Sequence, residues 1–441
     1  MGERMPRPLG LGLASRGVGV KYVDAMCLLL LPKMYQPFKY RLYPFKNQER
    51  ELLLQLGELK LLWNHSLEQR IDAWRMEGKS IGYVDQCRSL VKWRAYCPEL
   101  GRIYGHVAQE YIHRLDDAFK HFYRRCKSGE KPGYPRFKSE VTSLTYPDSN
   151  GSAAIVSGRN GTKRLHLAKI GDIPIEVHRK PAEGRVKTCT VERDGDRWYA
   201  ILTIEVPDPT PPPTTPPAKP VGIDLGLTSL ATLSTGEKIE PPKFLRKAEK
   251  RLKWFDREVA RKKKGSCNRE KAKVRRARYH ARVRDQRRDF AHKLTTNWAD
   301  TYDLIAFEDM DLPTHMQGKF PKATADAGWG LLRQHSEYKQ RNRSQHYVEV
   351  PTKGTTQTCS GCGRLHDPPL TLKDRTYDCP CGLRLDRDIN AAKNVVARAL
   401  AIVGRGTPEV TPVETVPPPH RKGRRVRLPK QEPTLASGVA F

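Results

Sequence analysis

A proline-rich segment near the middle of the chain constrains its fold more than any other feature. Residues 206–220 (VPDPTPPPTTPPAKP) hold eight prolines in fifteen residues. Proline lacks a backbone N–H and has a fixed φ, so this segment can form neither a helix nor a central strand and is typical of a semi-rigid polyproline linker. The chain therefore divides there, as 441 residues also suggest, because a single core stops growing well below that length.

The charge balance indicates the class of partner. Lys and Arg number 80 against 49 Asp and Glu, which gives a formal net charge of +31. A polyanion is the expected partner of such a chain, because phosphates neutralised by Lys and Arg release condensed counterions. The apolar run within residues 25–32 is far shorter than the roughly 20 residues of a membrane-spanning helix, and no secretion-type cleavage site follows it. We expect a nucleic-acid partner, no membrane insertion, and a location in the cell interior.

The first half alternates between two kinds of hydrophobic period. Residues 35–44 (YQPFKYRLYP) alternate apolar or aromatic residues with basic ones, which predicts a half-buried strand with one positive face. Residues 47–127 have helical spacing, and strand-like runs resume between residues 164 and 206. We expect the strands on both sides of the helical block to join one β domain.

Basic residues interleaved with aromatic ones in the first strand can meet phosphates with charge and bases with rings. The alternative is a solvated strand face with a packed aromatic side. The candidate nucleic-acid contacts are Lys39, Tyr40, Arg41, Tyr43 and Lys46.

Strands and helices alternate after the linker, which predicts an α/β half. We expect strands within 221–240, 302–309 and 346–351, and a helix over 326–339. Residues 243–288 carry 21 Lys or Arg against five acids and predict a pair of basic helices. A solvated charged helix is the alternative. The small number of acids to balance the basic residues favours contact with phosphates. The candidates on the second helix are Lys271, Arg275, Arg278 and Arg282.

Three acidic residues lie in or beside apolar segments, where a carboxylate costs most free energy. They are Asp224 in VGIDLG, Glu308 in LIAFED and Asp388 in LDRDINAAKN. Buried carboxylates are usually paired or bind a metal, and converging acids would suit Mg²⁺, with two ions activating water for phosphodiester hydrolysis. Gly222 and Gly226 beside the first acid would let a nucleic-acid backbone approach. The alternative is that each acid only ends a strand or caps a helix.

Four cysteines are concentrated in residues 359–381. The pairs Cys359/Cys362 and Cys379/Cys381 lie on glycine-containing turns and match a structural zinc site. The second pair has one intervening residue instead of two, so we expect either a strained ligand or a distorted site, with His366 as a possible substitute ligand. Reduced cysteines without metal are the alternative.

The ordered series of these motifs, together with FKYRLYPFKNQE and PGYPRFK upstream, resembles the TnpB family of transposon-encoded RNA-guided nucleases from about residue 35 to residue 403. That family is similar to the miniature type V CRISPR effectors, which share a split RuvC-like nuclease of RNase H fold. The resemblance implies that Asp224, Glu308 and Asp388 are the metal-binding catalytic acids. Asp386 competes with Asp388, which we prefer because it stands directly before Ile-Asn-Ala-Ala.

The resemblance also implies a multidomain α+β fold: an N-terminal β-barrel wedge domain with an inserted helical recognition domain, then an RNase H/RuvC-like α/β nuclease domain with an inserted zinc ribbon that binds target nucleic acid. The expected ranges are a disordered leader (1–34), the wedge (35–47 and 131–218), the recognition domain (48–130), the nuclease (219–354 and 384–403), the ribbon (355–383) and a disordered basic tail (404–441).

The function expected from the resemblance is RNA-guided cleavage of double-stranded DNA beside a short flanking motif, with Mg²⁺ and Zn²⁺ as cofactors and a guide RNA as partner. A miniature type V CRISPR effector is an alternative that genomic neighbours would separate. A nuclease-dead RNA-guided repressor is another, disfavoured by the presence of all three acids. A DNA-strand transposase is disfavoured because no Tyr or Ser stands in a recombinase context.

Overall fold

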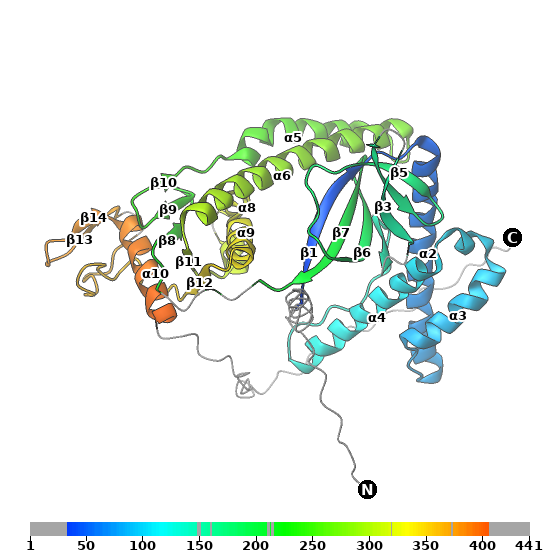
Figure 1. The fold of residues 1–441 in the computed structure, drawn as a ribbon, viewed down its shortest axis with the longest axis horizontal. Helices are drawn as coiled ribbons and strands as arrows, with labels where there is room; N and C mark the ends of the chain where they lie inside the picture. The colour runs from blue at the N-terminus through cyan, green and yellow to red at the C-terminus, as the bar shows by residue number, and fades with distance from the viewer. Residues whose placement is uncertain are drawn as a thin grey trace, which may run out of the picture.

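The structure is a computed structural model, and it describes residues 33–147, 151–158, 161–209, 212, 216–318, 320–371 and 374–404. It has two β-sheet units joined by a pair of long helices (Figure 1). The expected leader and tail lie outside these residues except at their inner ends. Residue Lys33 already belongs to the first strand, and the last helix ends at Gly404.

The first unit is built on an antiparallel sheet that, within the described residues, has seven strands in the order β2-β6-β7-β1-β5-β4-β3. Strand β1 pairs with β7 along its whole length and with β5 at its end. The strands that precede and follow the helical block therefore share one sheet, as the sequence predicted. The strand bounds are β1 (Lys33–Leu42), β2 (Ser143–Pro147), β3 (Ala153–Ser157), β4 (Lys163–Leu167), β5 (Gly171–Glu176), β6 (Arg185–Asp194) and β7 (Arg197–Pro207).

Helices are inserted between β1 and β2. Their bounds are α2 (Lys46–Glu77), α3 (Tyr83–Tyr96), the short 3₁₀ helix η1 (Pro98–Arg102) and α4 (Gly105–Lys127). Leucines spaced three or four apart on α2 face α4 and join the core of the sheet, so helices and sheet share one hydrophobic cluster. Trp63 of α2 also donates a hydrogen bond to the carbonyl of Arg136, which fastens the return segment to the helix.

The second unit is a mixed sheet with the order β10-β9-β8-β11-β12. Strands β8, β11 and β12 are parallel, and β9 and β10 form antiparallel hairpins beside β8. Strand β8 begins thirteen residues after β7 ends, across the proline-rich segment. The bounds are β8 (Pro220–Leu225), β9 (Ala231–Leu233), β10 (Lys238–Ile239), β11 (Leu304–Glu308) and β12 (His346–Val350).

Helices cover both faces of this sheet. On β11, Ile305 and Phe307 pack in a cluster with α6 and α9, whereas Leu304 and Ala306 pack against α10. Such alternation follows from the period of two along a strand. The helices of this unit are α5 (Phe244–Arg261), α6 (Cys267–Thr301), α7 (Leu312–Gln317), α8 (Pro321–Ala327), α9 (Trp329–Asn342) and α10 (Arg387–Gly404). The sequence predicted one helix over 326–339, but Gly328 in the left-handed region separates α8 from α9.

The long basic helices α5 and α6 connect the two units (Figure 1). Ser266 caps the start of α6 by accepting a hydrogen bond from the amide of Arg269, which explains the break between the helices. At the turn between β6 and β7, Asp194 and Asp196 pair with Arg284 and Arg278 of α6, at 2.5 and 2.6 Å. The sheet of the first unit is therefore tied to a helix of the second.

Candidate functional site

Strand register brings two of the predicted acids together. Ala306 of β11 lies opposite Gly222 of β8, and Phe307 lies opposite Ile223. One residue further along each strand, Glu308 and Asp224 therefore stand side by side at the carboxyl ends of parallel strands. Both belong to the face covered by α10, because side chains two residues apart share a face. Electrostatic coupling between these carboxylates is consistent with this placement, as Glu308 raises the pKa of Asp224.

The third acid comes from the first turn of α10. Asp386 precedes this helix and accepts hydrogen bonds from the amides of Asp388 and Ile389, at 3.0 and 3.3 Å, so it is the N-cap. Its other carboxylate oxygen lies 2.7 Å from the ammonium of Lys238. Asp388 contacts the guanidinium of Arg387 at 3.5 Å and repels the charge of Asp224. Both competing acids raise the pKa of Asp224, Asp388 more than Asp386, and Asp386 in addition holds the start of the helix.

The electrostatics of the site favour a bound cation. Burial, followed by repulsion from Glu308 and Asp388, raises the pKa of Asp224 well above its usual value. Burial also raises the pKa of Glu308, against a hydrogen bond with Thr355 and the charge of Arg398, and the Oε1 atom of Glu308 is buried without a partner. Buried carboxylates with raised pKa values are stabilised in their charged form by hard cations, which bind oxygen ligands. Oxygen donors of this kind are the ligands that Mg²⁺ prefers. Among the described residues, however, the four cysteines are gathered closely enough to hold a metal ion as they stand, and the three acids are not.

The pKa of Asp386 is shifted in the opposite direction from that of Asp224. Burial alone would raise the pKa of its carboxyl, but the ammonium of Lys238 and the amides at the start of α10 lower it below the usual range. Its charge is already compensated by protein groups. Both of its carboxylate oxygens are therefore already engaged by protein groups.

The glycines beside Asp224 correct one sequence expectation. A β-carbon on Gly222 would fall 2.1 Å from the carbonyl oxygen of Ala392 on α10, and one on Gly226 would fall 2.9 Å from the carbonyl oxygen of Ser229. Both glycines face protein backbone, so they do not open a path for nucleic acid. Gly222 instead lets the helix that carries Asp388 lie directly on β8.

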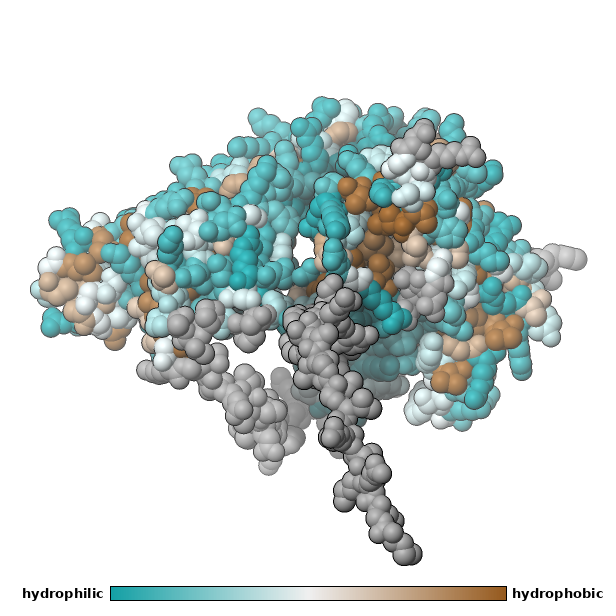
Figure 2. All heavy atoms as spheres, in the orientation of Figure 1, coloured by the Kyte–Doolittle hydropathy of each residue, from teal (hydrophilic) through white to brown (hydrophobic). Residues whose placement is uncertain are grey.

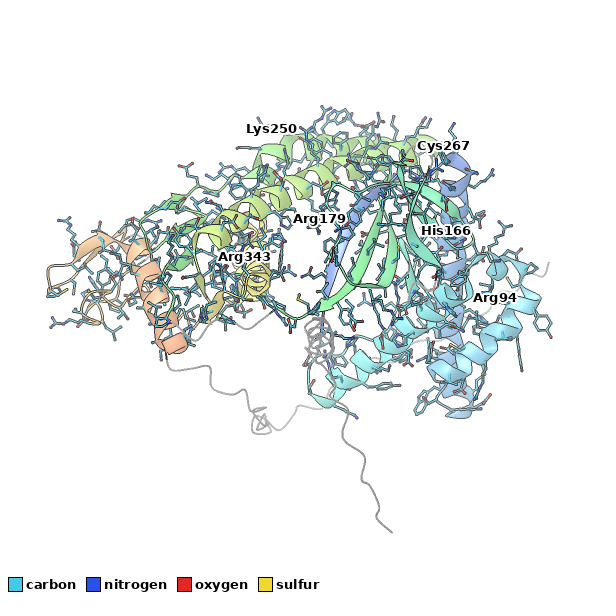
Figure 3. The ribbon with its side chains drawn as sticks, viewed as in Figure 1. Arg94, His166, Arg179, Lys250, Cys267 and Arg343 are labelled. Carbon is cyan, nitrogen blue, oxygen red and sulfur yellow. The ribbon has the colours of Figure 1, made fainter. Side chains whose placement is uncertain are left out.

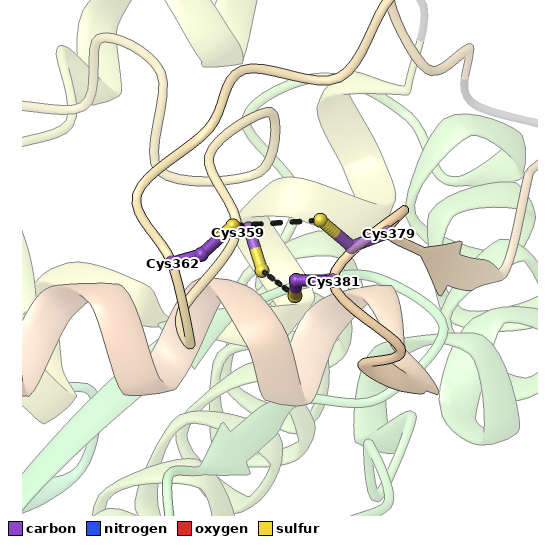
Figure 4. A group of neighbouring side chains, drawn as sticks. All are labelled: Cys359, Cys362, Cys379 and Cys381. Carbon is purple, nitrogen blue, oxygen red and sulfur yellow. Dashed lines mark hydrogen bonds between the residues drawn. The ribbon is translucent and has the colours of Figure 1, made fainter.

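The four cysteines converge (Figure 4). Their sulfur atoms all lie within 4.8 Å of one another, with 3.7 Å between Cys359 and Cys381 and 3.6 Å between Cys362 and Cys379. A tetrahedral zinc site with bonds of about 2.3 Å has sulfur–sulfur edges of about 3.8 Å. The one-residue gap in the second pair is accommodated because the amide of Gly382 closes a tight turn onto the carbonyl of Cys379. The donor set therefore fits Zn²⁺.

The thiols of the cluster shift one another's pKa in opposite directions, and that of Cys379 is raised to about 12. Amides of Cys362 and Gly361 and the neighbouring thiols lower the pKa of Cys359 to about 7, although burial opposes this. The expected substitute ligand His366 is engaged elsewhere: its Nδ1 atom lies 2.7 Å from the carbonyl oxygen of Pro368, and its ring packs against Tyr377. Strands β13 (Thr376–Asp378) and β14 (Arg384–Asp386) form the hairpin that connects this cluster to α10.

The candidates on β1 divide by exposure. Tyr40 is fully buried and donates to the carbonyl of Arg179, which corrects its expected role, because a buried ring cannot stack on a base. Lys39 pairs with Glu192 and lies over the Tyr199 ring. Arg41 lies between the Tyr43 and Tyr199 rings. Lys39 and Arg41 on the strand are thus partly exposed, whereas Tyr43, just after the strand, is half exposed and Lys46, at the start of α2, is exposed.

The four candidates on α6 form an exposed stripe. Lys271, Arg275, Arg278 and Arg282 recur at intervals of three or four residues and therefore share one helical face. Arg275 pairs with Glu258 and Arg278 with Asp196, both at 2.6 Å. The stripe borders a concavity of about 700 Å³, and Figure 2 shows that the surface over α5 and α6 is largely hydrophilic.

Sequence reasoning missed several groups near these sites. Trp254, 43% exposed beneath the guanidinium of Arg251, lines the concavity beside the basic stripe. Arg179 lies on the side of the first unit that faces α6 and α9 (Figure 3), where its charge helps lower the pKa of His292, after burial and Lys339. A lone tryptophan or arginine in a charged segment carries no pattern that would have singled it out.

No helix among the described residues is long and apolar enough to span a membrane. The comparisons with known proteins identify three stretches. A family profile described as “Probable transposase” matches residues 201–317, and one described as “Cas12f1-like, TNB domain” matches residues 329–395. A profile described as “Helix-turn-helix domain” matches residues 34–79, which here form β1 and α2.

Two relatives match most of the chain. A proposed RNA-guided DNA endonuclease of Streptomyces pristinaespiralis is 35% identical over 420 residues, which cover 92% of this chain and 98% of the relative. A second, from Escherichia coli K12, is 28% identical and covers 85% and 94%. Among solved structures, Cas12f1 in its complex with single-guide RNA and target DNA has a TM-score of 0.51 at 12% identity, covering 82% of this chain and 99% of that one. The likeness at this identity concerns the fold.

Proposed function

The chain belongs to the TnpB family of RNA-guided DNA endonucleases, and we propose that it cuts double-stranded DNA selected by a guide RNA, beside a short flanking motif, with Mg²⁺ held by Asp224, Glu308 and Asp388. The observation that carries this proposal is the pairing register of β8 and β11 beneath α10. It aligns two acids at strand ends and sets a third at the start of the helix that packs on them.

The protein residues have separable tasks in this mechanism. Asp224, Glu308 and Asp388 would hold Mg²⁺, which when bound activates water and stabilises the leaving oxygen of a phosphodiester. Arg387, whose charge lowers the pKa of Asp224, keeps that carboxyl closer to its ionised form before metal arrives. Asp386 holds the first turn of α10 in place. In the strand order β10-β9-β8-β11-β12, with helices on both faces, the unit is consistent with a RuvC-like nuclease of RNase H type.

The remaining units are proposed to hold the nucleic acids. We assign the seven-stranded sheet to a barrel-type wedge domain and the helices inserted after β1 to a recognition domain, which together would read the flanking motif and contact the guide. The positive face of β1 and the exposed stripe on α6 supply charge and rings for phosphates and bases. Sequence selection is delegated to guide pairing, so no base-specific pocket is needed for the target itself.

The decisive test is cleavage of matched and mismatched duplexes by protein purified with and without its co-purifying RNA. We expect cutting only of the matched duplex, only with RNA, and only with Mg²⁺ present. Equal cutting in all arms would mean an unguided nuclease. Guide-dependent binding without cutting would instead support the nuclease-dead repressor, which the three intact acids disfavour.

A further inference from the structure

A row of side chains on α10 binds the backbone that leads into the cysteine cluster. Asn390, Asn394 and Arg398 are spaced four residues apart and therefore share one face of the helix. We name these three residues the α10 ladder. Asn390 and Asn394 are buried, so their amides make hydrogen bonds that are shielded from water.

Asn390 forms hydrogen bonds with the peptide groups on both sides of Cys359. Its Nδ2 atom donates to the carbonyl of Thr358 at 2.7 Å, and its Oδ1 atom accepts from the amide of Ser360 at 2.9 Å. Both hydrogen-bonding groups of the side chain are used on the first cysteine turn. Asn390 is only two residues from Asp388. Its hydrogen bonds therefore connect the turn that carries the metal ligand Cys359 to the helical turn that carries the catalytic acid.

The rest of the ladder reaches toward Glu308. Asn394 donates to the carbonyls of Thr355 and Thr358, at 2.8 and 2.7 Å. Thr355, which is 1% exposed, lies beside the Glu308 carboxyl, and its hydroxyl donates to the carbonyl of Thr352 at 3.0 Å. Arg398 donates to the carbonyls of Pro351 and Lys353, at 2.8 and 3.0 Å. The segment from residue 351 to residue 360 is thus held along the helix, from the end of β12 to the cysteine cluster.

We propose that the α10 ladder positions the catalytic acids by coupling them to the zinc ribbon, so that metal binding at the four cysteines and metal binding at the acids stabilise one another. Asn390 and Asn394 are positioning residues, since neither needs to touch substrate. This inference rests on the proposed function only for the identity of the acid-site metal. Coupling of two binding sites is reciprocal by thermodynamic necessity, which supplies a test that does not depend on cleavage.

The first experiment measures zinc release from the guide-bound protein to a zinc-selective chromophoric chelator, with and without Mg²⁺. Mg²⁺ should slow zinc release from the wild-type protein and have no such effect in Asn390→Leu or Asn394→Leu, which keep the branched shape of the side chain but lose the hydrogen bonds. Lys393→Gln, on the exposed face of the same helix, is the matched control and should behave as wild type. Release that is insensitive to Mg²⁺ in the wild-type protein would overturn the coupling.

The second experiment measures the Mg²⁺ concentration that gives half-maximal cleavage, alongside target binding without Mg²⁺. Loss of a residue that orients metal ligands typically costs 10- to 100-fold in metal affinity or activity. We expect a shift of that size for both leucine variants, with target binding unchanged. Asn390→Asp should be milder because it still accepts from Ser360, and Asn394→Asp should be more severe because its carboxylate would face two carbonyl oxygens.

The two experiments separate this inference from the proposed function. Mg²⁺-dependent zinc release without any cleavage by the wild-type protein would refute the nuclease activity and keep the coupling. Normal cleavage at normal Mg²⁺ by variants that lose zinc quickly would show that the ladder only stabilises the ribbon, and the proposal would be wrong.

Discussion

Gly222 on β8 lies so close to Ala392 on α10 that a β-carbon at position 222 would stand 2.1 Å from the Ala392 carbonyl oxygen and 2.6 Å from the amide nitrogen of Val396. Strand and helix touch through backbone, two residues before Asp224 and four residues after Asp388. The separation of the two acids is therefore set by a glycine. Because both partners are backbone, neither can yield by rotating a side chain.

Gly222→Ala should displace α10 and destabilise the protein by roughly 1–3 kcal/mol, the usual range for overpacking a tight site. DNA cleavage should be lost before binding is, since the displacement moves Asp388 away from Asp224. Thermal unfolding and cleavage of the guide-bound protein measure both effects. Gly57→Ala, on α2 with nothing within 4 Å of the added carbon, is the control and should keep activity. Full activity of Gly222→Ala would contradict the proposed geometry.

The acids themselves give the second prediction. Asp224→Asn, Glu308→Gln and Asp388→Asn should each abolish cleavage while leaving guided DNA binding largely intact, because charge stabilisation of the reacting phosphate is lost and base pairing is not. Binding and cleavage are measured on the same duplex, with and without Mg²⁺.

Asp386 provides an internal control for this assignment. Asp386→Asn should retain most activity, since asparagine caps a helix about as well as aspartate, whereas Asp386→Ala should cost about 1 kcal/mol of stability through the lost cap. If Asp386→Asn is inactive and Asp388→Asn is active, the assignment of the third acid is reversed.

The third prediction concerns zinc. Purified protein should contain one equivalent of Zn²⁺, and Cys362→Ser should lose the metal and destabilise the ribbon, because a closed four-thiolate site supplies folding free energy and leaves no position for water. Metal analysis and resistance to proteolysis measure the effect. Cys126→Ser, an exposed cysteine on α4, should retain full zinc content. Zinc-free wild-type protein would show that the converging thiols serve another purpose.

The amino-acid sequence predicts the strands that carry two of the acids, but not how close the acids lie to one another. Apolar periodicity located the strands that carry Asp224 and Glu308, since buried strands have to be apolar on the faces they pack. The proximity of these acids depends on the parallel register of β8 with β11, a long-range pairing that no local pattern encodes. Asp388 was preferred to Asp386 only through the family resemblance, whereas the cap and the ion pair with Lys238 give Asp386 a physical role of its own.

The predicted roles of Tyr40 and Gly222 were wrong because tertiary packing determines what each residue contacts. Tyr40 alternates with basic residues as a binding residue would, yet it faces the core because the period of two sends alternate side chains inward. Gly222 was expected to admit nucleic acid, and instead admits a helix. The spacing of Asn390, Asn394 and Arg398 was visible in the sequence, but their partners are carbonyls, which every residue has.

The fourth prediction concerns acid stability. His335, buried between α9 and α6 and stacked on His292, has its pKa lowered to about 4 by burial and by the nearby charges of His292, Lys339 and Arg288. An unfolded histidine titrates near 6.5, so between about pH 6.5 and pH 4 the unfolded chain binds more protons and stability falls as pH is lowered.

The expected loss for His335 is roughly 1–3 kcal/mol at pH 4. His335→Gln should flatten the pH dependence of unfolding over this window, as followed by urea titrations at several pH values. His121→Gln, an exposed histidine on α4, is the matched control and should leave the wild-type slope. An unchanged slope in His335→Gln would mean that this histidine is protonated in the folded protein.

The last prediction concerns the basic stripe on α6. Arg282 is exposed, lines the concavity beside Trp254 and belongs to the same helical face as Lys271. If these residues contact phosphates, Arg282→Gln and Lys271→Gln should each weaken RNA binding at every sequence tested and reduce the slope of log affinity against log salt by about one. Arg88→Gln, an exposed arginine on α3 that pairs with Asp85, is the control and should leave the slope unchanged.

Arg275 and Arg278 should show smaller effects, because Glu258 and Asp196 already neutralise part of their charge and must be released before phosphate can bind. Equal salt slopes in wild type and in both exposed-residue variants would place the guide on another face of the protein.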